Sequence, residues 1–237
     1  MRIQYALDVL SRDEAMAMAS VAVEQGVFCL EAGHVLVKVC GVMILEDLRR
    51  RFGAVELVAD MKTMDMAADE VRIAAEAGAD LVIVCAAASN GALSAALEQA
   101  ERSHIAVLVS LMGVANRIQR TKELLALGVK RVIAHRGIDD NFAWADAQPA
   151  ADLRALLELD GISLAVAGGV TAESVDAFVG RGFERVIVGR GISAAKDPSA
   201  AARAFVEAAV RDSVARREAA RRRSPLAQTS APNASSR

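Results

Sequence analysis

Eight short apolar runs recur along the chain at nearly regular intervals. Each run is almost continuously apolar, and this pattern is typical of strands that are covered on both faces. The runs begin at Ile3, Val27, Val55, Leu81, Ile105, Arg131, Ile162 and Arg185. Their regular recurrence predicts eight buried strands of similar length.

The segments between these runs carry helical periodicity. Residues 12–26, 64–80 and 117–130 each hold a glycine near their end, where glycine commonly terminates a helix. Residues 149–159 begin with a proline, which suits the first turn of a helix. Because strands and helices alternate throughout, we expect crossovers between parallel strands.

Eight such units within residues 1–210 predict an α/β fold, a closed (β/α)8 TIM barrel that forms one catalytic domain. An open doubly wound sheet is the alternative, and eight evenly sized units fit it less well. In residues 211–237 the composition changes. We expect an arginine-rich end of the last helix and then a disordered tail of Ser, Ala, Pro and Asn. Arg221, Arg222 and Arg223 could bind an anion, but a solvated extension is the favoured interpretation.

The composition of the chain limits the classes of partner and the cellular location that we expect. Of the 237 residues, 54% are hydrophobic and 3% aromatic, so small aliphatic side chains must build the core. A net charge of −2 gives no reason to expect a nucleic acid or a membrane as partner. Cys29, Cys40 and Cys85 form no CxxC pair and are expected to be buried reduced thiols. With no secretory signal and no membrane-spanning run, the cytoplasm is the expected location.

Polar side chains stand where the predicted strands end. In a TIM barrel the chemistry belongs at the carboxyl ends of the strands. Helix capping explains one polar residue at such a place easily, but not six. The six residues are Asp8, Glu31, Asp60, Lys62, Ser110 and His135. We therefore expect a functional site at this end of the barrel.

The third of these strand ends, "ADMKTMD", suggests a cation site. Strand side chains alternate, so Asp60 and Lys62 are expected to point to the same side. Glu31 should lie on the neighbouring strand, about 5 Å away. Two carboxylates that close repel one another unless a cation lies between them, and Mg²⁺ prefers oxygen ligands. The alternative is a network of these three charged groups without a metal.

Glycine-rich segments follow the last two predicted strands, in "VAGGV" and "VGRGI". Loops at these two places commonly hold a phosphate in a TIM barrel. Gly168, Gly169 and Gly189 would let backbone N–H groups approach the anion, and Arg190 could clamp it. The two segments together predict a phosphorylated substrate.

A cation and an ammonium group together can stabilise an anionic oxygen, as in an enediolate. Lys62 would supply the ammonium group. His135 could then move a proton at neutral pH. The alternative for His135 is a surface histidine beside Arg136.

With these residues in place, the chain resembles the orotidine 5'-phosphate decarboxylase superfamily. It is most similar to the group of 3-hexulose-6-phosphate synthase and 3-keto-L-gulonate-6-phosphate decarboxylase. The resemblance covers about residues 1–209. It rests on "ALD" at Asp8, "LEAG" at Glu31, "ADMKTMD" from Ala59, "EAGAD" from Glu76, "AVAGGV" and "DPSAAA" from Asp197.

The resemblance implies a role for each matching residue. Glu31 and Asp60 match the Mg²⁺ ligands of the group, and Lys62 matches the lysine that stabilises the enediolate. Asp65 matches a residue that reaches the partner subunit's site, which implies a homodimer with shared active sites. His135 matches the histidine associated with proton delivery.

Gly169, Gly189 and Arg190 match the phosphate site of the group, and Gly168 adjoins it. Asp8 ends the first strand and is counted with the catalytic residues. Ser110 and Arg136 are counted with the groups that bind substrate.

The chain departs from the group at several positions. Ser110 stands where relatives carry an acid, Asp in the synthases and Glu in the decarboxylase, and a serine cannot act as a base near pH 7. His34 lies in "AGHVL", near the expected metal. Arg136 and Arg190 resemble the decarboxylase, whereas residues 137–139 resemble the synthase.

The leading hypothesis is therefore a Mg²⁺-dependent lyase that acts on a phosphorylated ketose. The first candidate is 3-hexulose-6-phosphate synthase, which adds the enediolate of ribulose 5-phosphate to formaldehyde. A 3-keto-L-gulonate-6-phosphate decarboxylase or a divergent sugar-phosphate lyase is the alternative within the superfamily. A non-catalytic protein that binds sugar phosphates is the alternative from another class.

Overall fold

Eight parallel strands form a closed barrel in the computed structural model, which describes residues 1–140 and 151–223. The barrel closes because β1 pairs with β8, from Arg2 opposite Arg185 to Tyr5 opposite Val188. The strands are β1 Arg2–Leu7, β2 Cys29–Ala32, β3 Glu56–Thr63, β4 Leu81–Cys85, β5 Ala106–Ser110, β6 Arg131–His135, β7 Ser163–Ala167 and β8 Arg185–Val188. The predicted TIM barrel is confirmed, and an open sheet is excluded.

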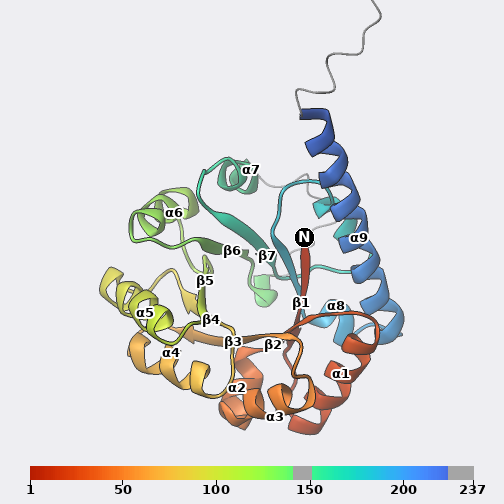
Figure 1. Ribbon diagram of the computed structural model, residues 1–237, viewed down its shortest axis with the longest axis horizontal. Coiled ribbons are helices and arrows are strands. Elements are labelled where there is room, and N and C mark those ends of the chain that lie inside the picture. The colour runs from red at the N-terminus through yellow and green to blue at the C-terminus, as the bar shows by residue number, and fades with distance from the viewer. Residues whose placement is uncertain (141–150, 224–237) are drawn as a thin grey trace, which may run out of the picture.

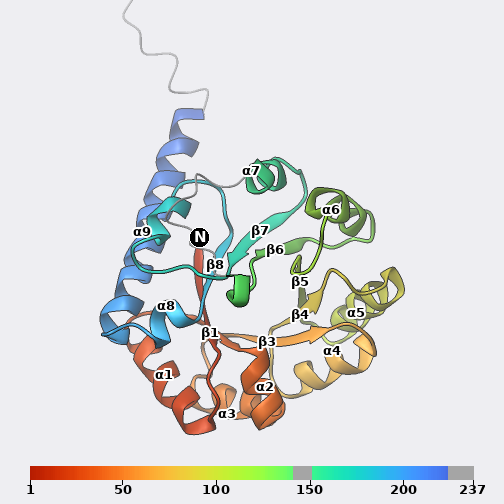
Figure 2. The same cartoon turned by 180° about the vertical axis from the view of Figure 1, so that it is seen from behind.

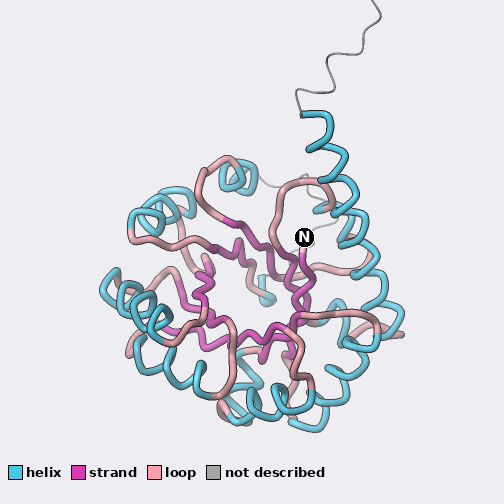
Figure 3. Tube along the Cα trace, viewed as in Figure 1, coloured by secondary structure: helices cyan, strands magenta, loops and turns pink. Residues whose placement is uncertain are grey.

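Helices surround the ring of strands (Figure 3). The helices are α1 Arg12–Glu24, α2 His34–Cys40, α3 Met43–Arg51, α4 Ala67–Glu76, α5 Asn90–Arg102, α6 Arg117–Ala126, α7 Ala151–Leu157, α8 Arg190–Ser193 and α9 Pro198–Arg223. Among the described residues, two short 3-10 helices, η1 Ile138–Asp140 and η3 Val175–Phe178, lie in the second half of the chain. Seen from behind, α8 lies beside the ends of β1 and β8 (Figure 2).

The predicted glycine stops are found where helices end. Gly26, Gly78 and Gly128 follow α1, α4 and α6, and each has a φ between 92° and 95°. The unit between β7 and β8 differs from the expected α-helix. There the chain forms only η3, because Gly180 and Gly182 adopt φ values of 72° and 99° that no regular helix contains.

The last helix, α9, continues to Arg223 and so includes the arginine-rich segment, as the sequence suggested. It lies along the outside of the barrel (Figure 1). The expected proline start at Pro149 and the expected disordered tail beyond residue 223 lie outside the described residues. No helix within the described ranges is both long and apolar enough to span a membrane.

Aliphatic side chains fill most of the barrel interior. A compact cluster there includes Val58, Ile83, Leu108, Ile133 and Ile187, all at most 6% exposed. A larger apolar layer separates the strands from the surrounding helices. Against this apolar background, the interior also holds buried polar side chains, among them Gln4, Glu31, Asp60 and Arg185.

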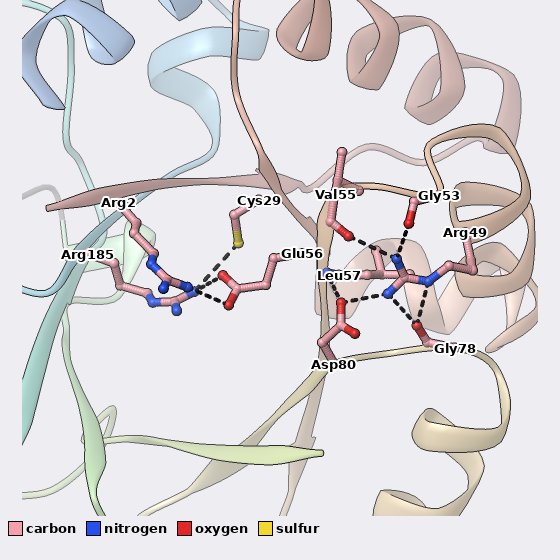
Figure 4. Close-up of polar contacts among 10 residues, drawn as sticks. All are labelled: Arg2, Cys29, Arg49, Gly53, Val55, Glu56, Leu57, Gly78, Asp80 and Arg185. Carbon is pink, nitrogen blue, oxygen red and sulfur yellow. Dashed lines mark hydrogen bonds and ion pairs between the residues drawn. The ribbon is translucent and has the colours of Figure 1, made fainter. Parts of the chain in front are cut away.

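Outside the barrel, Arg49 of α3 ties together the segments that lead into β3 and β4 (Figure 4). Its guanidinium donates to the carbonyl oxygens of Gly53, Val55 and Gly78 at 2.8–3.0 Å. It also donates to the carboxylate of Asp80 at 2.6 Å. This arginine is a structural anchor at the end of the barrel where the strands begin.

Candidate active site

A cavity of about 440 Å³ opens at the carboxyl ends of the strands. Its lining comes from the ends of β1, β2, β3, β6, β7 and β8, from the segments that follow them, and from Met112 after β5. Ten of the predicted site residues line it: Asp8, Glu31, Asp60, Lys62, His135, Arg136, Gly168, Gly169, Gly189 and Arg190. The fold therefore brings together residues that are far apart in the sequence.

A lysine and buried carboxylates form one side of this cavity. Lys62 Nζ donates to Asp60 Oδ2 at 2.6 Å. The side chains of Glu31 and Asp60 are each only 3% exposed. Asp60 Oδ1 is buried and has no hydrogen-bond partner among the described residues. A buried carboxylate oxygen without a donor is costly, so this atom is suited to bind a cation.

The end of β3 is irregular where these groups lie. The pairing of β3 with β4 passes from Ala59 opposite Val82 to Thr63 opposite Val84, so β3 carries two extra residues. Lys62 adopts a φ of 46°, a left-handed conformation that costs a non-glycine residue free energy. Lys62 and Asp60 do meet, as expected, but through this bulge and not through regular strand alternation.

The charges of the cluster are unbalanced. Burial and the carboxylates of Asp60 and Asp8 raise the pKa of Glu31 well above its usual range. Burial and Asp60 also raise the pKa of Asp8. Burial alone would lower the pKa of Lys62, but the surrounding carboxylates, Asp60 first, raise it overall. Three carboxylates therefore face one ammonium group, and a divalent cation would neutralise the excess.

His34 lies at the edge of the same cluster, as the first residue of α2. Its Nδ1 is 3.8 Å from Asp8 Oδ1 and 3.8 Å from Asp60 Oδ2. Burial and the charge of Lys62 lower the pKa of His34. The preceding residue must be small, because a Cβ on Gly33 would lie 2.2 Å from Asp8 Oδ1.

Ser110 and His135 form a pair at the ends of β5 and β6. Ser110 Oγ lies 3.2 Å from His135 Nδ1, and Ser110 is 1% exposed. The N–H of Met112 donates to Ser110 Oγ at 3.4 Å. The hydroxyl proton of a buried serine needs an acceptor, and His135 Nδ1 is in place to accept it. This geometry assigns the remaining ring proton to Nε2.

His135 is uncharged at neutral pH. Burial, followed by the positive charge of Lys62, lowers the pKa of His135 to about 3. The residue lines the cavity and is not the surface histidine of the alternative interpretation. It can therefore serve as a neutral N–H donor. Ser110 does not line the cavity itself, but it contacts two residues that do, His135 and Met112.

The two glycine-rich loops meet on the opposite side of the cavity. Gly168 has a φ of 93°, and a Cβ there would lie 2.0 Å from the carbonyl oxygen of Arg136. Gly169 has a φ of 69°. A Cβ on Gly191 would lie 2.2 Å from the carbonyl oxygen of Val170. Only glycine allows these backbones to approach so closely, and Arg190 lies exposed at the rim of the cavity.

Like Ser110, Asp65 is a predicted site residue that does not line the cavity of its own chain. It is exposed in the loop between β3 and α4. Its neighbours Met64 and Met66 are 50% and 65% exposed, which is unusual for large apolar side chains.

The cavity is also lined by residues outside the set predicted from the sequence, among them His34, Met112, Ile138 and Thr171. In the sequence, His34 is marked only by its departure from the pattern of the related group. Thr171 follows the glycine pair closely, and the loop signal that identified the glycines extends to it.

The family follows from a comparison of the whole chain. The family model described as Orotidine 5'-phosphate decarboxylase / HUMPS family matches residues 1–205. The chain belongs to this family. The similar members of this family are lyases, and this chain is an enzyme of that class.

Relatives of two kinds are similar to it. The 3-hexulose-6-phosphate synthase of Mycobacterium gastri is 34% identical over 206 residues, which cover 86% of this chain and 97% of the relative. The crystal structure of 3-hexulose-6-phosphate synthase from Salmonella typhimurium has a TM-score of 0.84 at 28% identity, covering 90% and 100% of the two chains. A crystal structure of KGPDC from Streptococcus mutans has a TM-score of 0.81 at 28% identity, covering 88% and 97%.

Proposed function

We propose that this enzyme is a Mg²⁺-dependent lyase of a phosphorylated ketose, with 3-hexulose-6-phosphate synthase activity as the first candidate. In this reaction ribulose 5-phosphate and formaldehyde are joined, which would serve formaldehyde assimilation and carbohydrate metabolism in the cytoplasm. One observation carries the proposal. The same cavity holds a carboxylate–lysine cluster on one side and two glycine loops with Arg190 on the other.

Glu31 and Asp60 are the residues that would hold Mg²⁺. The buried Oδ1 of Asp60 needs a partner, and the cluster has an excess of negative charge that a divalent cation would offset. No group of three or more His, Cys, Asp or Glu side chains is arranged for a metal within residues 1–140 and 151–223. Two protein ligands suit Mg²⁺, which usually keeps several waters. When bound, the ion would supply Lewis acidity that stabilises negative charge on substrate oxygens.

The other side chains have separate tasks in this proposal. The phosphate is held by backbone N–H groups of the glycine loops and by Arg190, which fixes the position of the sugar. Lys62 places its ammonium group where the anionic oxygens of the enediolate develop. His135 offers its Nε2 proton to the substrate as a neutral donor, held in this tautomer by Ser110.

An assay of formaldehyde consumption tests this proposal. With ribulose 5-phosphate, formaldehyde and Mg²⁺, the unaltered enzyme is expected to consume formaldehyde. Asp60→Ala, which removes one proposed ligand and the partner of Lys62, is expected to lower the rate at least about 100-fold. Equal and negligible consumption by the two proteins would contradict the synthase activity.

Decarboxylation of a 3-keto sugar-acid phosphate is the second candidate. Arg136 and Arg190 support it, because both resemble the decarboxylase, whereas Ser110 departs from both reactions alike. The similarity to KGPDC supports it as well. Release of CO₂ from such a substrate, without consumption of formaldehyde, would favour this reaction. Turnover of another sugar phosphate would instead identify a divergent lyase, and tight binding with no turnover under any metal would identify a non-catalytic binder.

A homodimer is part of the proposal. Asp65 is exposed beside two exposed methionines, and an exposed apolar patch of this kind is suited to a subunit interface. Because Asp65 does not line its own cavity, we infer that it reaches the cavity of a partner subunit.

A further inference from the structure

A line of buried polar side chains runs through the barrel interior beneath Glu31. Gln4 of β1 is 0% exposed, and its Nε2 donates to Glu31 Oε2. The other end of the same amide, Gln4 Oε1, accepts a hydrogen bond from Arg185 Nη1 at 2.6 Å. Three side chains from β1, β2 and β8 are thus linked in series, although Gln4 and Arg185 are 181 positions apart.

Arg185 is itself anchored at the opposite end of the barrel (Figure 4). It is 1% exposed, and its Nη1 donates to Glu56 Oε2 at 3.1 Å. Glu56 also accepts a hydrogen bond from Arg2 at 2.8 Å. The same Nη1 lies 3.5 Å from the sulfur of Cys29. The guanidinium is therefore held by groups from three strands.

The guanidinium of Arg185 costs free energy inside the barrel. The barrel interior around it is otherwise filled by aliphatic side chains, and burying a guanidinium costs free energy even when it is paired. Aliphatic side chains could fill the same space without that cost. The polar line therefore serves something other than packing.

The chemistry of the three groups allows only one arrangement. A guanidinium has donors and no acceptor, so it fixes the oxygen of the Gln4 amide on its own side. The amide nitrogen must then face Glu31 and donate to Oε2. Arg185 thus sets the orientation of Gln4, and Gln4 sets the orientation of the Glu31 carboxylate at the cavity.

We propose that Gln4, oriented by Arg185, is a positioning residue that holds the Glu31 carboxylate ready for the cation. The proposal rests on the proposed Mg²⁺ site. Groups that hydrogen-bond to a metal ligand typically change metal affinity 10–100-fold when they are lost. Here that group lies inside the barrel, on the side of Glu31 away from the substrate.

Calorimetric titration of the full chain with Mg²⁺ alone, without substrate, tests this role. Gln4→Leu removes both hydrogen bonds and is expected to weaken Mg²⁺ binding about 10–100-fold. Gln4→Glu keeps the shape and an acceptor for Arg185 but cannot donate to Glu31 as a carboxylate. The same weakening is expected for it. Arg185→Met frees the amide to turn and is expected to weaken Mg²⁺ binding as well.

Arg49→Met is the matched control. Arg49 also makes several hydrogen bonds with backbone carbonyls and a carboxylate, but it lies outside the barrel and makes no hydrogen bond to Glu31, Gln4 or Arg185 (Figure 4). This variant is expected to lower the melting temperature and leave the affinity for Mg²⁺ unchanged.

The outcomes separate the two proposals. If the unaltered protein binds Mg²⁺ and the folded Gln4 variants bind it equally well, the positioning role is wrong while the metal site stands. If the unaltered protein binds no Mg²⁺, the metal site fails and this role fails with it. Should Gln4→Leu not fold, the shape-preserving Gln4→Glu decides alone, with circular dichroism as the measure of folding. Weakening by Arg49→Met as large as by Gln4→Leu would also overturn the role, because it would reflect general loosening of the barrel.

Discussion

Burial and the nearby ammonium group of Lys62, more than the residue type, determine the charge of His135. A histidine in solution exchanges its proton near neutrality, and the sequence alone supports that expectation. In the fold, burial and Lys62 lower the pKa of His135 to about 3. The sequence could place His135 at a strand end, but it could not supply this environment, because Lys62 comes from a strand 73 positions earlier (135 − 62).

Nitrogen-15 NMR of the imidazoles tests the state of His135. The chain has three histidines, and His104 is exposed whereas His135 lines the cavity. His135 is expected to stay neutral down to about pH 3, with its proton on Nε2 and none on Nδ1. Ser110→Asp should raise the pKa of His135 and move a proton to Nδ1, because a carboxylate stabilises the imidazolium. Protonation of His135 near pH 6.5 in the unaltered protein would contradict this picture.

The same residue makes folding stability depend on pH. Its pKa in the folded chain lies below its ordinary value, so between about pH 6.5 and 3 the unfolded chain binds more protons than the folded chain. The free energy of unfolding should therefore decrease as the pH falls through this range, by up to about 1.4 kcal/mol per pH unit from this group. Urea denaturation of His135→Gln should show a shallower decrease. Identical pH dependence of the two proteins would rule out this contribution.

At the scale of elements, the periodicity of the sequence predicted the order and kind of nearly every unit. Glycines with positive φ end helices as expected, since a glycine at a helix end is a purely local signal. The bulge in β3 was not predictable, because it depends on how β3 pairs with β4. The hydrogen bond between Arg185 and Gln4 was not predictable either, because the local sequence around one residue carries no information about its contact with the other.

The loop after β7 offers a test of close backbone approach. Gly168 and Gly128 have the same φ of 93°, but only at Gly168 would a Cβ meet another atom, 2.0 Å away in the backbone of Arg136. Gly128→Ala is expected to cost about 1 kcal/mol in urea denaturation, from backbone strain alone. Gly168→Ala should cost at least about 2 kcal/mol and also weaken binding of ribulose 5-phosphate. Equal effects of the two substitutions would mean that the approach of the loops does not matter.

For the whole molecule, the sequence was sufficient for the closed barrel and for the clustering of ten site residues in one cavity. The rule that barrel chemistry lies at the carboxyl ends of strands turns scattered polar residues into one site. Asp65 does not follow that rule within one chain, and the role proposed for it needs a second subunit. A single sequence has no physical signal for that role beyond exposed apolar neighbours.

Mixing two inactive variants tests the shared site. Lys62→Ala and Asp65→Ala are each expected to lose activity as pure proteins. If Asp65 serves the partner, a mixed dimer has one complete site, formed by Lys62 of the Asp65→Ala chain and Asp65 of the Lys62→Ala chain. Activity should therefore reappear after subunit exchange. No recovery, with mixed dimers demonstrated by mass spectrometry, would place Asp65 in its own chain's chemistry or outside it.

In the proposed function the cavity has two separable halves, one for the chemistry and one for the phosphate. The most direct measurement is a calorimetric titration of ribulose 5-phosphate into Glu31→Gln, a variant expected to have no turnover. Because the glycine loops and Arg190 are untouched, the affinity is expected to stay within a few-fold of that of the unaltered enzyme. An affinity that falls as steeply as the turnover would contradict it.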